Sequence, residues 1–128
     1  GHGKGSFGWD VAAAMLAAGL PPDTISSDVH AMSALGPAFD QLVTMSKFLH
    51  LGMPIPEIVA ASTINAAKAI GRPELGGLAV GGPSDVTLLR IQEGAFPLTD
   101  ASGVTVEARR CFGLAGYVRD GVWSAPTR

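Results

Sequence analysis

The chain has 128 residues, of which 47% are hydrophobic and 16% charged, a composition typical of one globular domain with its own core. Nine Lys and Arg side chains against eleven Asp and Glu give a formal charge of −2, so no basic field exists to attract nucleic acid or an anionic membrane. The single cysteine, Cys111, excludes an internal disulfide framework and a cysteine-rich zinc knuckle. We expect it to be a buried thiol in a cytoplasmic protein.

The first seven residues form a glycine-rich stretch, GHGKGSF. Its spacing does not fit a phosphate-binding P-loop, because Lys4 is followed by Gly5 rather than by a serine or threonine. It is also one residue short of the dinucleotide-binding pattern Gly-x-Gly-x-x-Gly. Three interpretations remain open: a simple turn, an anion site at the start of the following helix, or a site histidine at His2.

Helices are predicted where runs of helix-forming or amphipathic residues end at a glycine. The first covers residues 9–18 and stops at Gly19, and the second covers residues 39–51 and stops at Gly52. A third begins around Pro56, a favoured first-turn position, and continues towards Gly71. His50, in the last turn of the second helix, is expected to be structural.

Residues 24–28 form a short β-prone run that follows two prolines, and we predict a strand there. At the end of such a strand Asp28 and His30 would project to the same face, because side chains alternate along a strand. A carboxylate and an imidazole in that position could bind a metal or act as a general base. A Ser-Ser-Asp sequence is also common in helix caps and Asx turns, so both interpretations stay open.

From Gly76 onward glycines and prolines separate short β-branched runs. The predicted strands cover residues 85–91, 96–99, 104–106 and 112–118. Asp120-Gly121, between two apolar runs, predicts a tight hairpin turn with positive φ. We therefore expect an α/β segment at residues 1–71, joined to a small antiparallel β module at residues 72–128.

The chain contains five stretches that follow one another in a characteristic order: residues 1–7, 22–30, 44–49, 65–71 and 76–86. Together they resemble the C-terminal part of the amidohydrolase superfamily, and most closely its dihydroorotase-like amidohydrolase and deacetylase enzymes. Two departures, Asn65-Ala66-Ala67 in place of Asn-Pro-Ala and Ser84-Asp85 in place of Ala-Asp, fall at structural positions.

The resemblance implies an α/β fold: the C-terminal part of a (β/α)8 TIM-like barrel plus a share of a small β-sandwich. Residues 1–71 would hold the last part of the barrel and residues 72–128 the sandwich portion. Because a complete barrel needs about 250 residues, the resemblance also implies a fragment that is inactive alone.

The resemblance further implies that Asp28 is both a metal ligand and the catalytic acid–base group. The cofactor would be one or two divalent metal ions, with zinc expected, and most ligands would come from strands earlier in the barrel. His2, Gly3, Lys4 and His30 would line the substrate pocket.

The implied function is metal-dependent hydrolysis of an amide or ester bond in a small acylated acid, by an enzyme that could form homo-oligomers. The alternative is a non-catalytic helical and β module whose glycine-rich loop binds an anion.

Overall fold

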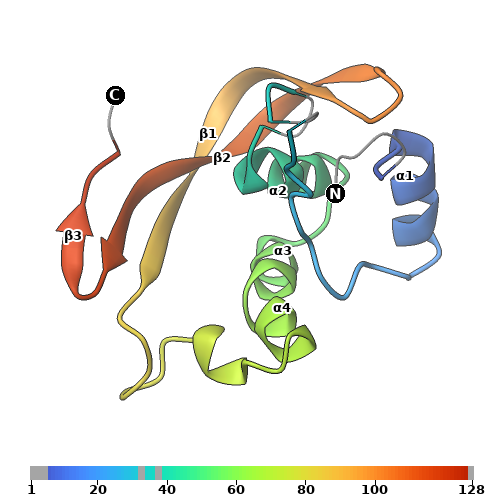
Figure 1. Cartoon of the computed structure of the whole chain (residues 1–128). Helices are drawn as coiled ribbons and strands as arrows, with labels where there is room; N and C mark the ends of the chain where they lie inside the picture. The colour runs from blue at the N-terminus through green and yellow to red at the C-terminus, as the bar shows by residue number, and fades with distance from the viewer. Residues whose placement is uncertain (1–5, 32–33, 37–38, 127–128) are drawn as a thin grey trace.

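A computed structural model of the chain describes residues 6–31, 34–36 and 39–126. Four helices are followed by a short 3₁₀ helix and three strands (Figure 1). The elements are α1 Trp9–Ala17, α2 Gln41–His50, α3 Ile55–Ser62, α4 Ile64–Ala69, η1 Pro73–Leu75, β1 Val86–Thr99, β2 Thr105–Arg119 and β3 Val122–Ser124. Within these residues no helix is both long and apolar enough to cross a membrane.

The predicted glycine stops are confirmed at three helices. After α1 the amide of Gly19 donates to the Leu16 carbonyl and the amide of Leu20 to the Met15 carbonyl, both at 3.0 Å. This pair of hydrogen bonds is the Schellman motif, and it needs the positive φ of +73° that Gly19 has. Gly52 and Gly71 end α2 and α4 with the same pattern.

The single helix predicted from Pro56 towards Gly71 is wrong in one respect, because it breaks at Thr63. The Thr63 hydroxyl donates to the Val59 carbonyl at 2.7 Å. The Ala61 carbonyl, which a continuous helix would use internally, accepts from the amide of Ile25 at 3.0 Å instead. The result is two helices, α3 and α4.

The β half of the chain is a three-stranded antiparallel sheet in the order β1-β2-β3. The four predicted runs join into two long strands, because β1 pairs with β2 from Val86↔Val118 to Thr99↔Thr105, across two register shifts. The hairpin at Asp120-Gly121 is confirmed: Arg119 pairs with Val122, and the two turn residues have φ of +49° and +77°.

The strand predicted at residues 24–28 is wrong: this segment belongs to no sheet of the described structure. A strand exists only where a neighbour supplies ladder hydrogen bonds, and here the partners come from helices and side chains. The Ile25 amide bonds to Ala61, and its carbonyl accepts from Nε2 of Gln41 at 2.9 Å.

Two apolar clusters hold the fold together, and each combines residues from before and after Gly71. The larger joins α2 and α3 to the sheet, and the smaller joins the start of α1 to the end of the β1–β2 hairpin. Their buried members are Ile25, Met45, Leu49, Met53, Ile58, Ala61 and Phe112 in the first, and Phe7, Trp9, Leu98 and Ala108 in the second. Cys111 is buried as expected, and burial raises the pKa of its thiol. The division into units at residues 1–71 and 72–128 stays a prediction.

Candidate active site

The segment that leads to Asp28 is fixed to the helices by its backbone. Ile25 is 4% exposed in the larger cluster and hydrogen-bonded on both its amide and its carbonyl. Nδ2 of Asn65 donates to the Asp23 carbonyl at 3.0 Å. The chain therefore arrives at Asp28 from an anchored stretch.

Asp28 itself has a left-handed backbone, with φ of +51°. This conformation is uncommon outside glycine, although aspartate tolerates it better than most residues, and it is concentrated at turns and functional sites. It also ends the extended run, so the alternation that would put Asp28 and His30 on one strand face does not apply. That argument from the sequence is wrong.

The Asp28 carboxylate is exposed and meets the segment that precedes α1. Oγ of Ser6 donates a hydrogen bond to Oδ2 of Asp28 at 3.1 Å, across 22 positions of sequence. The end of the glycine-rich stretch and the Ser27-Asp28 stretch, both singled out in the sequence, therefore lie side by side. An exposed carboxylate oriented by a hydroxyl can accept a proton or ligate a cation.

The other predicted site residues are placed less fully. His30 is exposed, and its carbonyl accepts from the amide of Ala34 at 2.9 Å. His2, Gly3 and Lys4 lie outside the described residues. Among residues 6–31, 34–36 and 39–126 no group of three or more His, Cys, Asp or Glu side chains could hold a metal. Asp28 thus fits the role of one carboxylate ligand, and the described residues do not complete a set around it.

A lysine is buried next to two aromatic rings of the smaller cluster, and its burial was not predicted from the sequence. Lys47 is 0% exposed, and its ammonium donates to the Thr99 carbonyl. Nζ lies 5.3 Å from the ring centroid of Phe7 and 6.0 Å from that of Trp9. Burial lowers the pKa of this ammonium from 10.5 to about 8, and the nearby charge of Asp100 partly opposes the shift. Nothing in the helix pattern distinguishes Lys47 from a solvated lysine.

His50, expected to be structural, packs its ring edge-on against Trp9, with the ring centroids 5.6 Å apart. Its side chain lies at the exposed end of α2. The contact supports the aromatic cluster around Trp9.

Comparison with known protein families identifies the family of this chain. The model of the Amidohydrolase family matches residues 4–116, which is most of the chain. The chain belongs to the amidohydrolase family. The resemblance seen in the sequence is therefore confirmed at the level of the family.

Two curated relatives of this amidohydrolase chain are called deacetylases. One, from Agrobacterium fabrum, is 38% identical over 112 residues, and the other, from Brucella anthropi, is 36% identical over 112 residues. Each alignment covers 88% of this chain, and the chain spans only 28% of the length of either relative.

Solved structures agree with this assignment. The crystal structure of an adenine deaminase superposes with a TM-score of 0.92 at 30% identity, and that of a dihydroorotase with 0.89 at 35%. Both matches cover 98% of this chain and 34% of the solved chain.

Proposed function

We propose that this chain acts as part of a longer metal-dependent amidohydrolase that hydrolyses an amide or ester bond in a small acylated acid. The family match and the relatives that are called deacetylases support a hydrolase. The observation that carries the proposal is the exposed Asp28 carboxylate, held on a left-handed backbone against Ser6.

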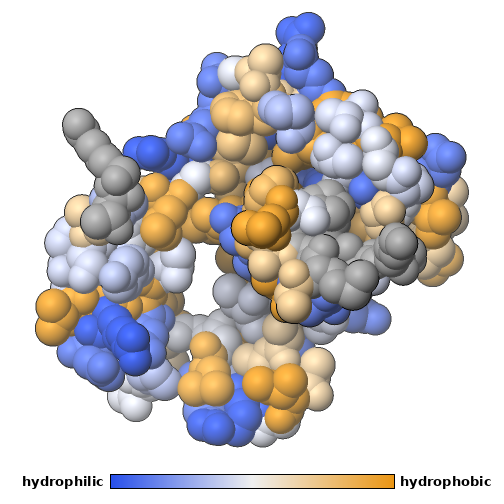
Figure 2. Space-filling model, turned by 45° about the horizontal axis from the view of Figure 1, so that its top comes forward, coloured by the Kyte–Doolittle hydropathy of each residue, from blue (hydrophilic) through white to orange (hydrophobic). Residues whose placement is uncertain are grey.

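In the longer enzyme, residues 1–71 would form the last part of a (β/α)8 barrel and β1–β3 a share of a small β-sandwich. The surface supports a larger assembly. Apolar side chains gather over several parts of the face in Figure 2, and large ones such as Leu35, Leu78 and Val80 are more than three-quarters exposed, at 95%, 78% and 107%. Exposure on this scale is typical of surfaces that a partner or another part of the protein covers.

Asp28 would serve the reaction as acid–base group. Its carboxylate takes a proton from the attacking water and passes that proton to the leaving amine or alcohol, so the residue ends the cycle as it began. Asp28 would also provide one ligand to a divalent metal, for which we propose zinc. When bound, such a metal polarises the scissile carbonyl and makes water easier to deprotonate.

The glycine-rich stretch would meet the acidic end of the substrate. Lys4 supplies a positive charge for a substrate carboxylate, and His2, Gly3 and His30 would complete the pocket wall. If so, Lys4→Ala in the intact enzyme raises KM for anionic substrates, and an unchanged KM would contradict this role.

The experiment is Asp28→Asn in the intact enzyme, assayed on a panel of N-acyl amino acids and O-acyl hydroxy acids. We expect kcat to fall by about 10²-fold or more while the melting temperature is unchanged, because the side chain is exposed. Asp23→Asn is the matched control, since Asp23 is also exposed and its carbonyl, not its carboxylate, holds Asn65. Turnover retained in Asp28→Asn would overturn the assignment.

A further inference from the structure

The turn that joins β1 to β2, residues 100–104, reaches the segment that carries Ser6; we refer to it as the β1–β2 turn. Figure 1 shows it close to the start of α1. The amide of Ala101 donates to the Phe7 carbonyl at 2.9 Å, and Nε1 of Trp9 donates to the Val104 carbonyl at 3.0 Å. The Trp9 amide donates to Oδ2 of Asp100 at 3.3 Å. Residues 7–9 are therefore tied to the turn from both backbone and side chain.

Asp100 has its own carboxylate fixed by the turn. Oδ1 accepts from the Ser102 amide at 2.9 Å, the Ser102 hydroxyl at 2.8 Å and the Val104 amide at 2.9 Å. Burial alone would raise the pKa of Asp100, but these hydrogen bonds and that from Trp9 outweigh it and hold the pKa below its ordinary value. The carboxylate is thus ionised, and hydrogen bonds from the turn and from Trp9 set its orientation.

Residues 7–9 also contact α2. Phe7 and Trp9 are 5% and 7% exposed and pack edge to face with ring centroids 5.1 Å apart. The Lys47 ammonium lies within cation–π distance of both rings. Residues 7–9 are consequently fixed between the turn and the helix, and Ser6 is the next residue along the chain.

We propose that Ser6 is a positioning residue for the Asp28 carboxylate, and that the β1–β2 turn, through Asp100, determines where Ser6 lies. This inference rests on the proposed function, in which Asp28 moves the proton. Asp28 is an exposed residue with a left-handed backbone, and the hydrogen bond from the Ser6 hydroxyl connects one oxygen of its carboxylate to the segment that precedes α1. Small errors in the placement of a reacting group are costly in rate.

The first test compares Ser6→Ala and Ser6→Thr in the intact enzyme. We expect Ser6→Ala to lower kcat about tenfold or more with KM within about twofold, since a hydrogen bond to a charged group is lost. Ser6→Thr keeps the hydroxyl and restores most of kcat. Ser84→Ala is the matched control, because Ser84 is exposed and precedes β1 at the end of the sheet opposite to the turn. An unchanged kcat, or a raised KM alone, would overturn the positioning role.

The second test reads the same coupling without turnover, by amide hydrogen exchange. Ser6→Ala is expected to accelerate exchange in residues 26–30, and Asp100→Asn to accelerate it both in residues 6–9 and in residues 26–30. If Asp100→Asn fails to fold, Ser102→Ala is a milder change, because it removes the hydrogen bond from the Ser102 hydroxyl to Oδ1 of Asp100 and keeps the one from the Ser102 amide. If Asp100→Asn accelerates exchange at residues 6–9 but not at residues 26–30, the proposed role of the turn is overturned. An inert wild-type enzyme whose Ser6→Ala variant still shows faster exchange would contradict the proposed function alone.

Discussion

The amide of Phe112, on β2, donates a hydrogen bond at 2.9 Å to Oγ of Ser46, on α2. The Ser46 hydroxyl in turn donates to the Leu42 carbonyl at 2.6 Å. Ser46 is 1% exposed and Phe112 6%, so this bond joins helix and sheet inside the larger apolar cluster, away from water. It satisfies a buried amide in the middle of β2.

Ser46→Ala should therefore destabilise the protein by about 1–3 kcal/mol, because it leaves the buried Phe112 amide unsatisfied. The change in melting temperature measures it. Thr44→Val, two residues earlier on α2, is the matched comparison. Oγ1 of Thr44 is buried with no hydrogen-bond partner among the described residues. Its removal should be neutral or stabilising. An equal decrease in melting temperature in the two variants would contradict the different roles assigned to the two hydroxyls.

The stability of the protein should rise with pH between about 8 and 10.5 because of Lys47. In that window the folded protein has lost the proton of this buried ammonium, whereas the unfolded chain, with a pKa near 10.5, still binds it. Raising the pH therefore reduces the free-energy cost of burying this amine. The free energy of unfolding rises by about 3 kcal/mol across the full window. Below pH 8 both states are protonated and this contribution is constant.

Unfolding measured from pH 7.5 to 10.5 tests the effect, with Lys47→Met as the reference, since methionine keeps the apolar stem and removes the titrating group. The difference between the two proteins isolates Lys47 from the other groups that titrate in this range. Parallel curves would show that the ammonium is not buried in solution.

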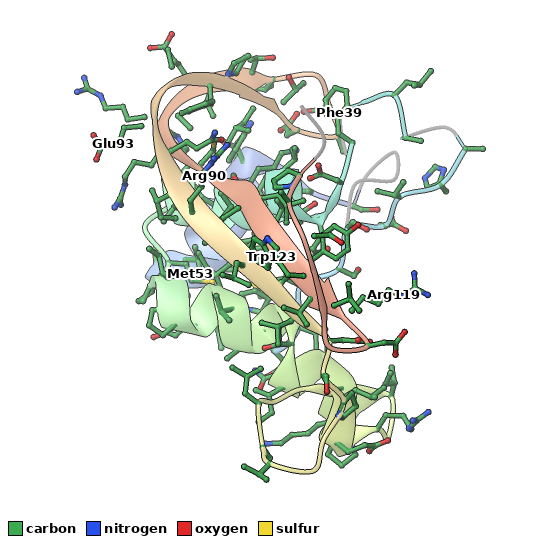
Figure 3. All side chains as sticks on the ribbon, turned by 90° about the vertical axis from the view of Figure 1, so that its left-hand side faces the viewer. Phe39, Met53, Arg90, Glu93, Arg119 and Trp123 are labelled. Carbon is green, nitrogen blue, oxygen red and sulfur yellow. The ribbon has the colours of Figure 1, made fainter. Side chains whose placement is uncertain are left out.

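Gly116 is expected to be intolerant of a side chain, because the Trp123 ring lies directly on it. A Cβ built at Gly116 would come within 2.0 Å of Cη2 of Trp123. Figure 3 shows Trp123 against the sheet while Arg119 points away from it. Gly116→Ala should lower stability by about 1–3 kcal/mol and make Trp123 more accessible to acrylamide quenching. Gly77→Ala, with nothing within 4 Å of the new Cβ, should leave both unchanged.

Removal of metal should abolish hydrolysis by the intact enzyme, if the proposed function holds. A chelator followed by gel filtration should give an inactive protein, and added zinc should restore turnover. Asp28→Asn should bind the restored metal more weakly than wild type does, because it lacks one carboxylate ligand. Full activity in metal-free protein would contradict the proposal.

Much of the local structure could be predicted, because short-range chemistry decides it. Gly19, Gly52 and Gly71 end helices, since only glycine readily adopts the left-handed turn that a Schellman motif needs. Asp120-Gly121 makes its hairpin for the same reason. Two predictions are wrong for a shared reason: the strand at residues 24–28 and the uninterrupted helix after Pro56. The Ile25 amide donates to the Ala61 carbonyl, and no local sequence pattern indicates this long-range hydrogen bond.

The candidate site divides in the same way. The sequence by itself determined that Asp28 and the glycine-rich stretch are candidates, through residue types and an order of motifs that identify the family. Only the tertiary structure decided that Ser6 contacts Asp28. It also decided that residues 7–9 pack between Lys47 and Asp100. Partners 22 and 52 positions apart are brought together by the packing of α2 and of the β1–β2 hairpin. Neighbours along the chain carry no record of such contacts, because burial and charge pairing are properties of the assembled fold.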